Sequence, residues 1–436
     1  MNENSPIFHD PAGKRWPIFK RIGIYTALCC SVLGALLCVT ILFLPTSRLA
    51  GAYRDDLTTF TIKPSRAEAV GQYLLKHSPD KLKAHMQAKR ATRDIRRQRK
   101  QHIRADGKPN QTVIGFYVNW DSNSFNSFRD HIDALTYVMP EWLSLPTTND
   151  EHPFIDRFSA RTRDPEMVKL AKAHDLPIIP ILNNADEEDF RWEPLRRLLS
   201  DESRQRALAV ALRDHLLMHG YAGINLDFEP PYENMSHAEM VEAHALLPTA
   251  FPHFVKILKQ TFAPANLLVT QDLPVALRED QPDLEKDNFN YEQLADLNDL
   301  VILMQYDEHA DTDPPGPIAS QPWLEDTADE LFAQMDSSKV ILGIGNYCYD
   351  WPADIDAAGN IHGKGRGQEL LLGAALTKAR DAHATIQMDD DELNPYFGYR
   401  DPATGQSHVV YMLDAVTAYN HIKALKGYEP RGAALW

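Results

Sequence analysis

The chain has 436 residues, of which 44% are hydrophobic and 24% are charged. This length exceeds one average domain, and the apolar fraction supplies a large core, which excludes a wholly disordered protein. Only four cysteines are present, and three of them (Cys29, Cys30 and Cys38) lie in one apolar stretch. A disulfide scaffold is therefore excluded.

Charge is distributed unevenly along the chain. Residues 1–110 carry 20 Lys and Arg against 8 Asp and Glu, although the net charge of the whole chain is -16. The first quarter is therefore basic and the remainder is strongly acidic. An acidic body is repelled by nucleic acid and by anionic lipid, so this distribution argues against a nucleic-acid enzyme and favours a neutral or positive ligand.

The stretch from Ile22 to Ser47 is uncharged and long enough to cross a bilayer. More Lys and Arg residues precede it than follow it closely, which favours a cytoplasmic N-terminus. We predict a cytoplasmic tail at residues 1–21, a single transmembrane anchor at 22–47 in the inner (cytoplasmic) membrane, and a body on the extracytoplasmic side. The alternative is a cleaved signal peptide, for which Ala50-Gly51-Ala52 has the small-x-small pattern.

Residues 48–110 are rich in Lys and Arg, and residues 64–104 have a helical pattern. We predict a basic helical stalk that holds the body away from the membrane. The alternative is a contact with an anionic polymer or with lipid headgroups. The turn-rich segment from Ala105 to Asn110 marks the boundary of the domain at residues 111–436.

Short apolar runs alternate with helical patterns in this domain. Runs that are apolar on both faces and alternate with helices predict a parallel sheet, and eight of them fit a (β/α)8 TIM barrel better than a six-stranded open sheet. The expected strands are Val113–Val118, Ala134–Val138, Pro177–Leu182, Ala222–Phe228, Leu267–Leu273, Leu300–Gln305, Val340–Ile344 and Gly432–Trp436. The expected helices include Asp164–His174, Glu202–His219, Ser236–Thr261 and Asp326–Gln334.

No helical segment follows the last expected strand, although a barrel usually places a helix there. We therefore predict that the sequence is a fragment of a longer protein, truncated at strand 8. The alternative is a barrel that lacks its last helix.

Apolar and polar residues alternate strictly from Gly223 to Pro230. Asn225, Asp227 and Glu229 thus share one face of a strand, which points into a barrel and places Glu229 at the carboxyl-terminal rim. Acid and amide groups inside a barrel are costly unless they are hydrogen-bonded and used. The alternative is an ordinary strand with its polar face in water.

This segment resembles the Asp-x-x-Asp-x-Asp-x-Glu motif of glycoside hydrolase family 18, the chitinase-like (β/α)8 hydrolases. Asp227 and Glu229 keep the last two acids, whereas Ala222 and Asn225 replace the first two. The Asn variant is similar to the branch with bacterial spore-cortex and peptidoglycan N-acetylglucosaminidases. The resemblance spans about residues 112–436 through Gly115–Trp120 on the first strand, Met304-Gln305-Tyr306-Asp307, a small α+β insertion before the last strand around Tyr399–Asp414, and Trp436.

Two segments refine the resemblance. Ile181-Leu182-Asn183-Asn184 replaces the Ser-x-Gly-Gly pattern that is common on the third strand, which is a departure from the true chitinases. Tyr306–His309 and Pro315–Ala319 resemble membrane-anchored barrels that are fused to a polysaccharide deacetylase and a glycosyltransferase. Both enzymes are therefore expected partners in the same longer chain.

The resemblance implies hydrolysis of a polysaccharide that contains N-acetylglucosamine, which is peptidoglycan, chitin or poly-N-acetylglucosamine. The acetamido group of the substrate acts as nucleophile in this family. Glu229 would be the acid and base, Asp227 would orient the acetamido N–H, and Tyr306 would hold its carbonyl. Asn225 can hydrogen-bond Asp227 but cannot share a proton with it, and it is also a candidate for substrate binding. No metal and no cofactor is required by this chemistry.

Further residues are candidates for substrate binding. Trp436 and Trp120 would stack on sugar faces, unless they are plain core residues. Tyr117 and Gln271 are expected on inward strand ends, and Asp307 would hydrogen-bond the sugar or a loop. Two readings without catalysis compete: a carbohydrate-binding barrel that guides or senses a polysaccharide, and a structural spacer. Retention of the three catalytic candidates favours the enzyme.

Overall fold

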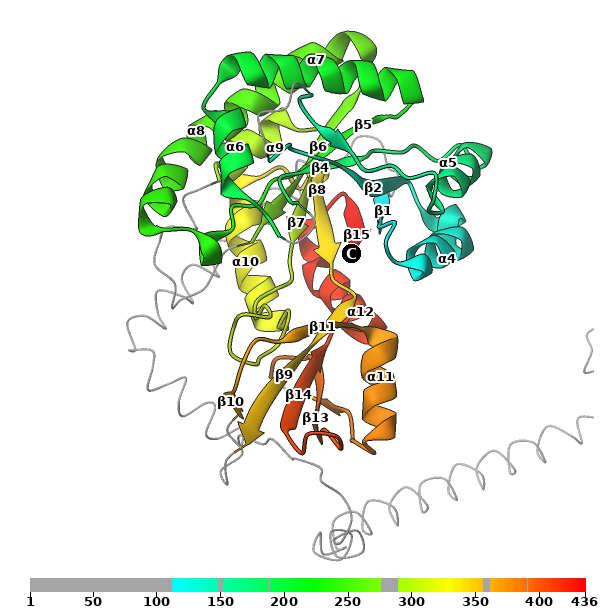
Figure 1. The fold of residues 1–436 in the computed structure, drawn as a ribbon, viewed down its shortest axis with the longest axis vertical. Coiled ribbons are helices and arrows are strands. Elements are labelled where there is room, and N and C mark those ends of the chain that lie inside the picture. The colour runs from blue at the N-terminus through cyan, green and yellow to red at the C-terminus, as the bar shows by residue number, and fades with distance from the viewer. Residues whose placement is uncertain (1–111, 148–151, 187–188, 276–288, 356–360, 390) are drawn as a thin grey trace, which may run out of the picture. The chain divides into compact units, whose positions relative to one another are not determined.

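The computed structural model describes residues 112–147, 152–186, 189–275, 289–355, 361–389 and 391–436. Eight parallel strands follow one another in the order β1, β15, β8, β7, β6, β5, β4 and β2, and β1 also pairs with β2. The sheet therefore closes on itself, which confirms the predicted eight-stranded barrel (Figure 1). These strands are β1 (Thr112–Tyr117), β2 (Tyr137–Ser144), β4 (Ile181–Asn183), β5 (Gly223–Asp227), β6 (Leu268–Pro274), β7 (Leu300–Met304), β8 (Val340–Ile344) and β15 (Gly432–Leu435).

Helices surround the barrel. They are α4 (Ser122–His131), α5 (Asp164–Ala173), α6 (Trp192–Leu199), α7 (Glu202–His219), α8 (His237–Phe262), α9 (Tyr291–Leu297), α10 (Gln321–Gln334) and α12 (Ala415–Leu425). Helix α8 starts where a capping box predicts it: the Ser236 hydroxyl accepts from the backbone N–H of Glu239, and the Glu239 carboxylate accepts from the backbone N–H of Ser236. A short strand, β3 (Ile155–Asp156), pairs antiparallel with the end of β2.

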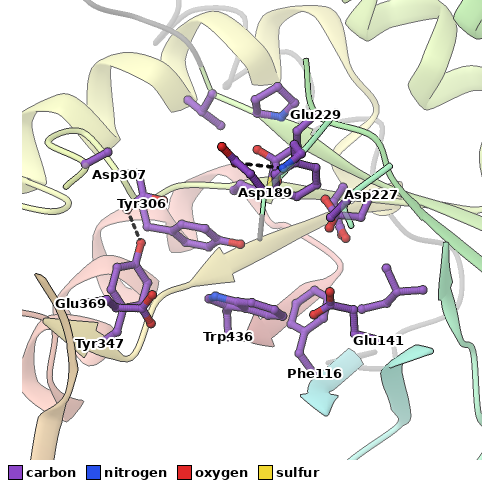
Figure 2. Close-up of a pocket in the computed structure, with 18 of the residues that line it drawn as sticks. Phe116, Glu141, Asp189, Asp227, Glu229, Tyr306, Asp307, Tyr347, Glu369 and Trp436 are labelled. Atoms are coloured by element: carbon purple, nitrogen blue, oxygen red, sulfur yellow. Dashed lines mark hydrogen bonds between the residues drawn. The ribbon is translucent and has the colours of Figure 1, made fainter. Parts of the chain in front are cut away.

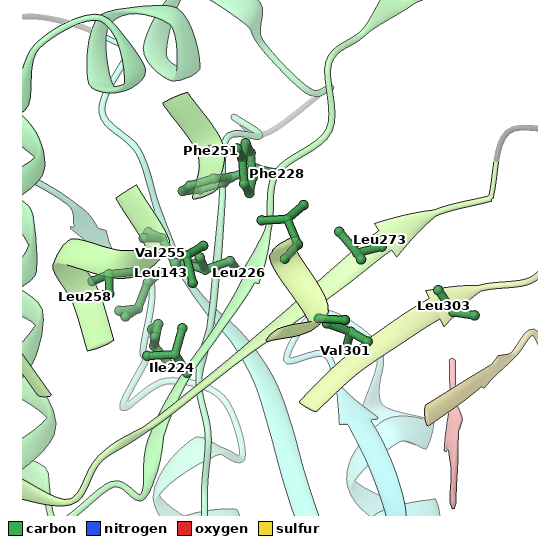
Figure 3. Packing of buried hydrophobic residues seen from close by; sticks show 14 of the residues in the cluster. Leu143, Ile224, Leu226, Phe228, Phe251, Val255, Leu258, Leu273, Val301 and Leu303 are labelled. Carbon is green, nitrogen blue, oxygen red and sulfur yellow. The ribbon is translucent and has the colours of Figure 1, made fainter. Parts of the chain in front are cut away.

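Two apolar layers fix which side chains of each strand point inward. A small cluster fills the barrel interior, with Ile114, Met139, Ile181, Ile302, Ile341 and Ala434 among its members. A larger cluster lies between the strands and the helices. There, Ile224, Leu226 and Phe228 of β5 and its extension pack near Phe251, Val255 and Leu258 of α8 (Figure 3). Odd residues of β5 therefore face the interior, as the alternation of polar residues predicts.

An α+β insertion separates β8 from α12. Its sheet contains β9 (Tyr347–Ile355), β10 (Ile361–Gly363), β12 (Gln387–Met388), β13 (Pro395–Arg400) and β14 (Ser407–Met412), and β11 (Gln368–Leu371) also pairs with β9. Helix α11 (Leu372–Asp381) covers one face of the sheet (Figure 1). The insertion precedes the last barrel strand, as predicted, but it is larger than the predicted Tyr399–Asp414 stretch.

The predicted tail, anchor and stalk at residues 1–110 lie outside the described residues. Within the part of the chain that the structure describes, no helix combines the length and the apolar character needed to cross a bilayer.

Candidate active site

Strand β5 presents its polar face at the carboxyl-terminal end of the barrel. Asn225 pairs in register with Ile181 of β4 and with Thr270 of β6, and Asp227 pairs with Asn183. Glu229 follows directly after the strand. Asn225 is fully buried, whereas Asp227 and Glu229 are partly exposed to a cavity of about 1070 Å³. Both carboxylates point into this cavity together with Tyr306 and Trp436 (Figure 2).

Two asparagines at the end of β4 hold the acidic groups in place. The Asn184 amide clamps the backbone of Glu229, since its Oδ1 accepts from the Glu229 N–H at 2.9 Å and its Nδ2 donates to the Glu229 carbonyl at 2.8 Å. The Asn183 amide donates to the carboxylate of Glu141 on β2 at 2.8 Å. This Asn-Asn pair occupies the place of the Ser-x-Gly-Gly pattern, and it therefore has a structural role at the site.

Removal of the Asn184 amide is expected to misplace Glu229. In Asn184→Ala, buried backbone groups of Glu229 lose their partners, which costs about 1–3 kcal/mol of stability. A shift of about 1 Å in a reacting group can cost on the order of 100-fold in rate, so kcat is expected to fall as well. Asn298→Ala is the matched control, because Asn298 is equally buried but donates to Gln271 and to the Leu294 carbonyl instead.

Chemical denaturation and steady-state kinetics separate the two effects. Both variants are expected to lose stability, and only Asn184→Ala is expected to lose kcat beyond the loss of folded protein. Equal kcat values in the two folded variants would contradict a positioning role for Asn184.

Asn225 is hydrogen-bonded to β6 and not to its neighbour on β5. Its Nδ2 donates to the carboxylate of Asp272 at 2.5 Å, and its Oδ1 accepts from the Thr270 hydroxyl at 2.7 Å. The amide is satisfied across the strand pair and does not form the hydrogen bond to Asp227 that its chemistry allows. Asn225 is also absent from the cavity lining, so the structure does not place this predicted binding residue at the cavity surface. Asp272 lines the cavity as a carboxylate that the motif does not contain.

Tyr306 and Asp307 lie on the segment after β7, which is separated from β5 by β6 alone. Tyr306 lines the cavity, and its ring meets that of Tyr347 edge-on at a centroid distance of 6.0 Å. Asp307 has a left-handed backbone with φ +61, and its carboxylate accepts from the hydroxyls of Tyr347 at 2.6 Å and Tyr349 at 3.1 Å. Both tyrosines belong to β9, so the insertion supports this wall of the cavity.

Aromatic rings form much of the remaining surface. Trp436 follows β15 and meets Phe116 of β1 edge-on at 5.2 Å, and 39% of its surface stays exposed. Trp120 is 64% exposed and lines the same cavity. Exposed indole and phenol rings are suited to cover the C–H faces of sugars. Phe190, Trp323 and Tyr349 also line the cavity, and the motifs gave no signal for them.

Burial and mutual repulsion raise the pKa values of the carboxyl groups. Burial raises the pKa of Asp227 to about 7. Burial, followed by the charges of Asp227, Asp307 and Asp272, raises the pKa of Glu229 well above its usual range. The hydrogen bond between the two side chains raises the pKa of Glu229 and lowers that of Asp227, so Glu229 is the weaker acid of the pair. Glu229 is thus prepared to act as an acid near neutral pH.

The same shifts predict that stability falls as the pH rises. Burial raises the pKa of Glu141 to about 7 and that of Asp307 to about 6. A carboxyl group whose pKa is higher in the folded state binds more protons there, so its stabilising effect is lost as the pH rises through the folded value. The free energy of unfolding is therefore expected to fall between about pH 4 and pH 7, by up to about 1.4 kcal/mol per pH unit for each group.

Denaturant titrations at several pH values test this dependence. Glu141→Gln is expected to flatten it, whereas Glu330→Gln on the exposed side of α10 is a matched control that leaves it unchanged. An unchanged slope in Glu141→Gln would contradict the raised pKa of Glu141.

The structure places two predicted binding residues outside the cavity. Tyr117 packs against Phe128 of α4 at a centroid distance of 6.2 Å, and Gln271 accepts from Asn298 at 2.9 Å behind β6. The prediction that these two side chains point into the barrel is wrong. Successive residues of a strand point to opposite faces, so the inward position in each strand belongs to the neighbouring residue. Phe116 and Asp272 take the inward positions instead.

A family model described as glycosyl hydrolases family 18 matches residues 112–436, which include the barrel, the insertion and every residue of the site. The chain belongs to this family. Family 18 membership and the paired acidic groups support a glycosidase.

Relatives of this family 18 chain include the cortical fragment-lytic enzyme of Bacillus subtilis (strain 168), which is 23% identical over 61% of this chain. The match spans 58% of that relative, which is less than two thirds of its length. The uncharacterized glycosylase YvbX of the same strain is 24% identical over 77% of this chain and 89% of its own.

Solved structures show the same fold. The spore cortex-lytic enzyme SleL of Bacillus megaterium QM B1551 aligns with a TM-score of 0.60 at 20% identity, over 76% of this chain and 71% of that chain. A chitinase from Chromobacterium violaceum ATCC 12472 aligns with a TM-score of 0.61 at 18% identity, over 75% of this chain and 93% of that chain. At these identities the alignments establish the fold alone.

Proposed function

We propose that this family 18 chain cleaves a polysaccharide that contains N-acetylglucosamine, with retention of configuration and with help from the substrate itself. Family 18 glycosidases use the acetamido group of the sugar as the nucleophile, so that a single protein acid is sufficient. The observation that supports this mechanism best is the placement of Glu229 beside Asp227 and Tyr306 in one cavity lined by aromatic rings.

In the first step, Glu229 gives its proton to the glycosidic oxygen and the bond from that oxygen to the anomeric carbon breaks. The acetamido carbonyl oxygen of the same sugar forms a new bond to the anomeric carbon, which yields an oxazolinium intermediate. In the second step, a water molecule attacks the anomeric carbon, its proton passes to Glu229, and the ring of the intermediate opens. Two inversions at one carbon retain the configuration.

Two neighbours of Glu229 stabilise the intermediate in this proposal. Asp227 accepts the acetamido N–H and faces the positive charge that develops on that group. Tyr306 donates its hydroxyl to the acetamido carbonyl and turns it toward the anomeric carbon. Burial and the surrounding carboxylates raise the pKa of Tyr306 well above its usual range, so the hydroxyl keeps the proton that it donates.

Reducing-end release from defined oligomers tests the proposal. We expect cleavage of N-acetylglucosamine oligomers and of peptidoglycan glycan strands, and no cleavage of the fully deacetylated oligomer. The first product is expected to have the β configuration in proton NMR spectra. Glu229→Gln is the control. Cleavage of the deacetylated oligomer would contradict substrate assistance, and binding of acetylated oligomers with no cleavage would instead identify a carbohydrate-binding barrel that guides or senses a polysaccharide.

We further propose that residues 22–47 anchor the barrel to the extracytoplasmic face of the inner membrane. The uncharged apolar run and the preceding Lys and Arg residues support this placement. A polysaccharide deacetylase and a glycosyltransferase in the same longer chain would then meet the same polymer. Protease added to spheroplasts is expected to digest the barrel, and full protection in intact spheroplasts would contradict the orientation.

A further inference from the structure

The cavity has a strongly acidic lining. Ten of the described residues that line it carry carboxylates, and Arg157 is the one basic residue among them. Glu141, Asp227, Glu229, Asp272 and Asp307 form the centre described above. The other five lie on the segments after β4 and β7 and on β11: Asp186, Asp189, Glu308, Asp313 and Glu369.

Among the outer carboxylates, Asp186 forms an ion pair with Arg191 at 2.5 Å, whereas Asp189 and Glu369 form no ion pair with a described cation. Arg157 lowers the pKa of Glu141, so the single guanidinium acts at that carboxylate. Asp189 accepts from the side-chain amide of Asn234 at 2.9 Å and from the backbone N–H of Phe190 at 2.8 Å, and both donors are neutral. Glu369 as a whole is exposed, although partial desolvation of its carboxyl group at the cavity wall, followed by the charge of Asp311, raises its pKa.

Asp272 supplies a second and independent observation. Only 4% of its surface is exposed, and its Oδ1 has no hydrogen-bond partner among the described residues. A buried carboxyl oxygen without a partner is rare in folded proteins, because the lost hydration is not replaced, and burial together with the charge of Asp227 raises the pKa of this group well above its usual range. Since Asp272 lines the cavity, a donor on a bound ligand can reach this part of the wall.

The acidic groups are spread around the cavity and do not converge on one point. Among the described residues, no group of three or more His, Cys, Asp or Glu side chains is arranged to hold a metal ion. In Figure 2, Glu369 and Glu141 lie on either side of Trp436, and Asp227 and Glu229 lie above it in the view. This distribution fits an extended ligand that carries several separated positive charges.

We propose that the preferred substrate is a partly deacetylated polysaccharide, in which an N-acetylated sugar at the cleavage position is flanked by glucosamine units with free ammonium groups. The inference rests on the proposed function, because the acetamido nucleophile is needed at the cleavage position alone. Asp189 and Glu369 attract the ammonium groups of the flanking sugars. A glycan that carries carboxylates is repelled by the same lining.

The expected effect is moderate and depends on salt. Partly exposed charge pairs contribute up to about 1 kcal/mol, so each ammonium group is expected to improve kcat/KM by up to about fivefold. Salt screens such contacts, so most of the preference is expected to disappear at about 1 M salt. A preference that came from hydrogen bonds or from shape would persist there.

The test compares three oligomers of equal length on the full chain: one fully acetylated, one with glucosamine on both sides of a single acetylated unit, and one acetylated but carrying carboxylates. We measure kcat/KM for cleavage, and the dissociation constant with the Glu229→Gln variant. The glucosamine oligomer is expected to be best on both measures and the carboxylate oligomer worst. An equal or better result with the fully acetylated oligomer would overturn the inference.

Variants assign the effect to the acidic lining. The ratio of kcat/KM values for glucosamine and acetylated oligomers is expected to fall about fivefold in Asp189→Asn and in Glu369→Gln, and to stay the same in Glu330→Gln. An unchanged ratio in both cavity variants would overturn the inference. If no oligomer is cleaved, the proposed function fails, whereas the dissociation constants still decide whether the cavity selects the ammonium groups.

Discussion

Glu229→Gln is expected to reduce kcat by about a thousandfold or more, because general acid and base catalysis contributes on the order of 10²–10⁴ and Glu229 serves in both steps. The amide is nearly the same size as the carboxyl group but has no proton to give at neutral pH. The backbone of residue 229 is still held by Asn184 in this variant, so the side-chain position is expected to change little.

Calorimetric titration together with reducing-end release separates catalysis from binding. The dissociation constant of Glu229→Gln for acetylated oligomers is expected to stay within about threefold of the natural value, because the substitution removes an interaction made in the transition state and not in the bound ground state. Glu308→Gln is a useful comparison, because Glu308 lines the cavity while its carboxylate accepts from the backbone N–H and the hydroxyl of Ser320. Activity in Glu229→Gln above a tenth of the natural value would assign the acid to another residue.

The sequence predicts the barrel well, because parallel strands buried on both faces appear as short apolar runs. All eight runs correspond to barrel strands, and Val340–Ile344 matches β8 at both ends. The second strand is the least accurate: Ala134–Val138 was expected, and β2 extends from Tyr137 to Ser144. Pro140 and Glu141 interrupt the apolar run there. Glu141 lines the cavity, and the same polar residue makes the strand harder to predict from the sequence.

Inward and outward side chains can be predicted only where polarity alternates. On β5 the polar residues mark one face, and Asn225, Asp227 and Glu229 follow the expected direction. The segments around Tyr117 and Gln271 contain no comparable alternation, so nothing in the sequence distinguishes their two faces. Both side chains point to the face of the strand opposite the predicted one.

Contacts between strands account for the site residues that the motifs miss. Asn184 acts on Glu229 across 45 positions of sequence, and Asp272 meets Asn225 across 47. Such pairs depend on the strand order and register, which local patterns do not contain. One signal was available: two adjacent asparagines at the end of a strand stand where the family has small residues, and buried amides need partners.

Asp227→Asn is expected to lower kcat by about 10²–10³, because one preorganised charge that faces the developing positive charge is lost. The variant also removes the second largest cause of the raised pKa of Glu229, after burial. The pKa of Glu229 is therefore expected to fall, and the alkaline limb of the kcat/KM profile moves to lower pH. A loss of rate without this movement would mean that Asp227 does not share its environment with Glu229.

Glu141→Gln is the control that distinguishes the loss of any negative charge in the cavity from the loss of the charge at Asp227. It removes a carboxylate from the same cavity, one whose raised pKa depends in part on the charge of Asp227. If net negative charge alone sets the rate, both variants lose kcat equally. If the position of Asp227 beside the reacting acetamido group is decisive, Asp227→Asn loses at least tenfold more kcat than Glu141→Gln, and it alone shifts the alkaline limb. Equal losses would remove Asp227 from the mechanism and leave it as part of the acidic lining.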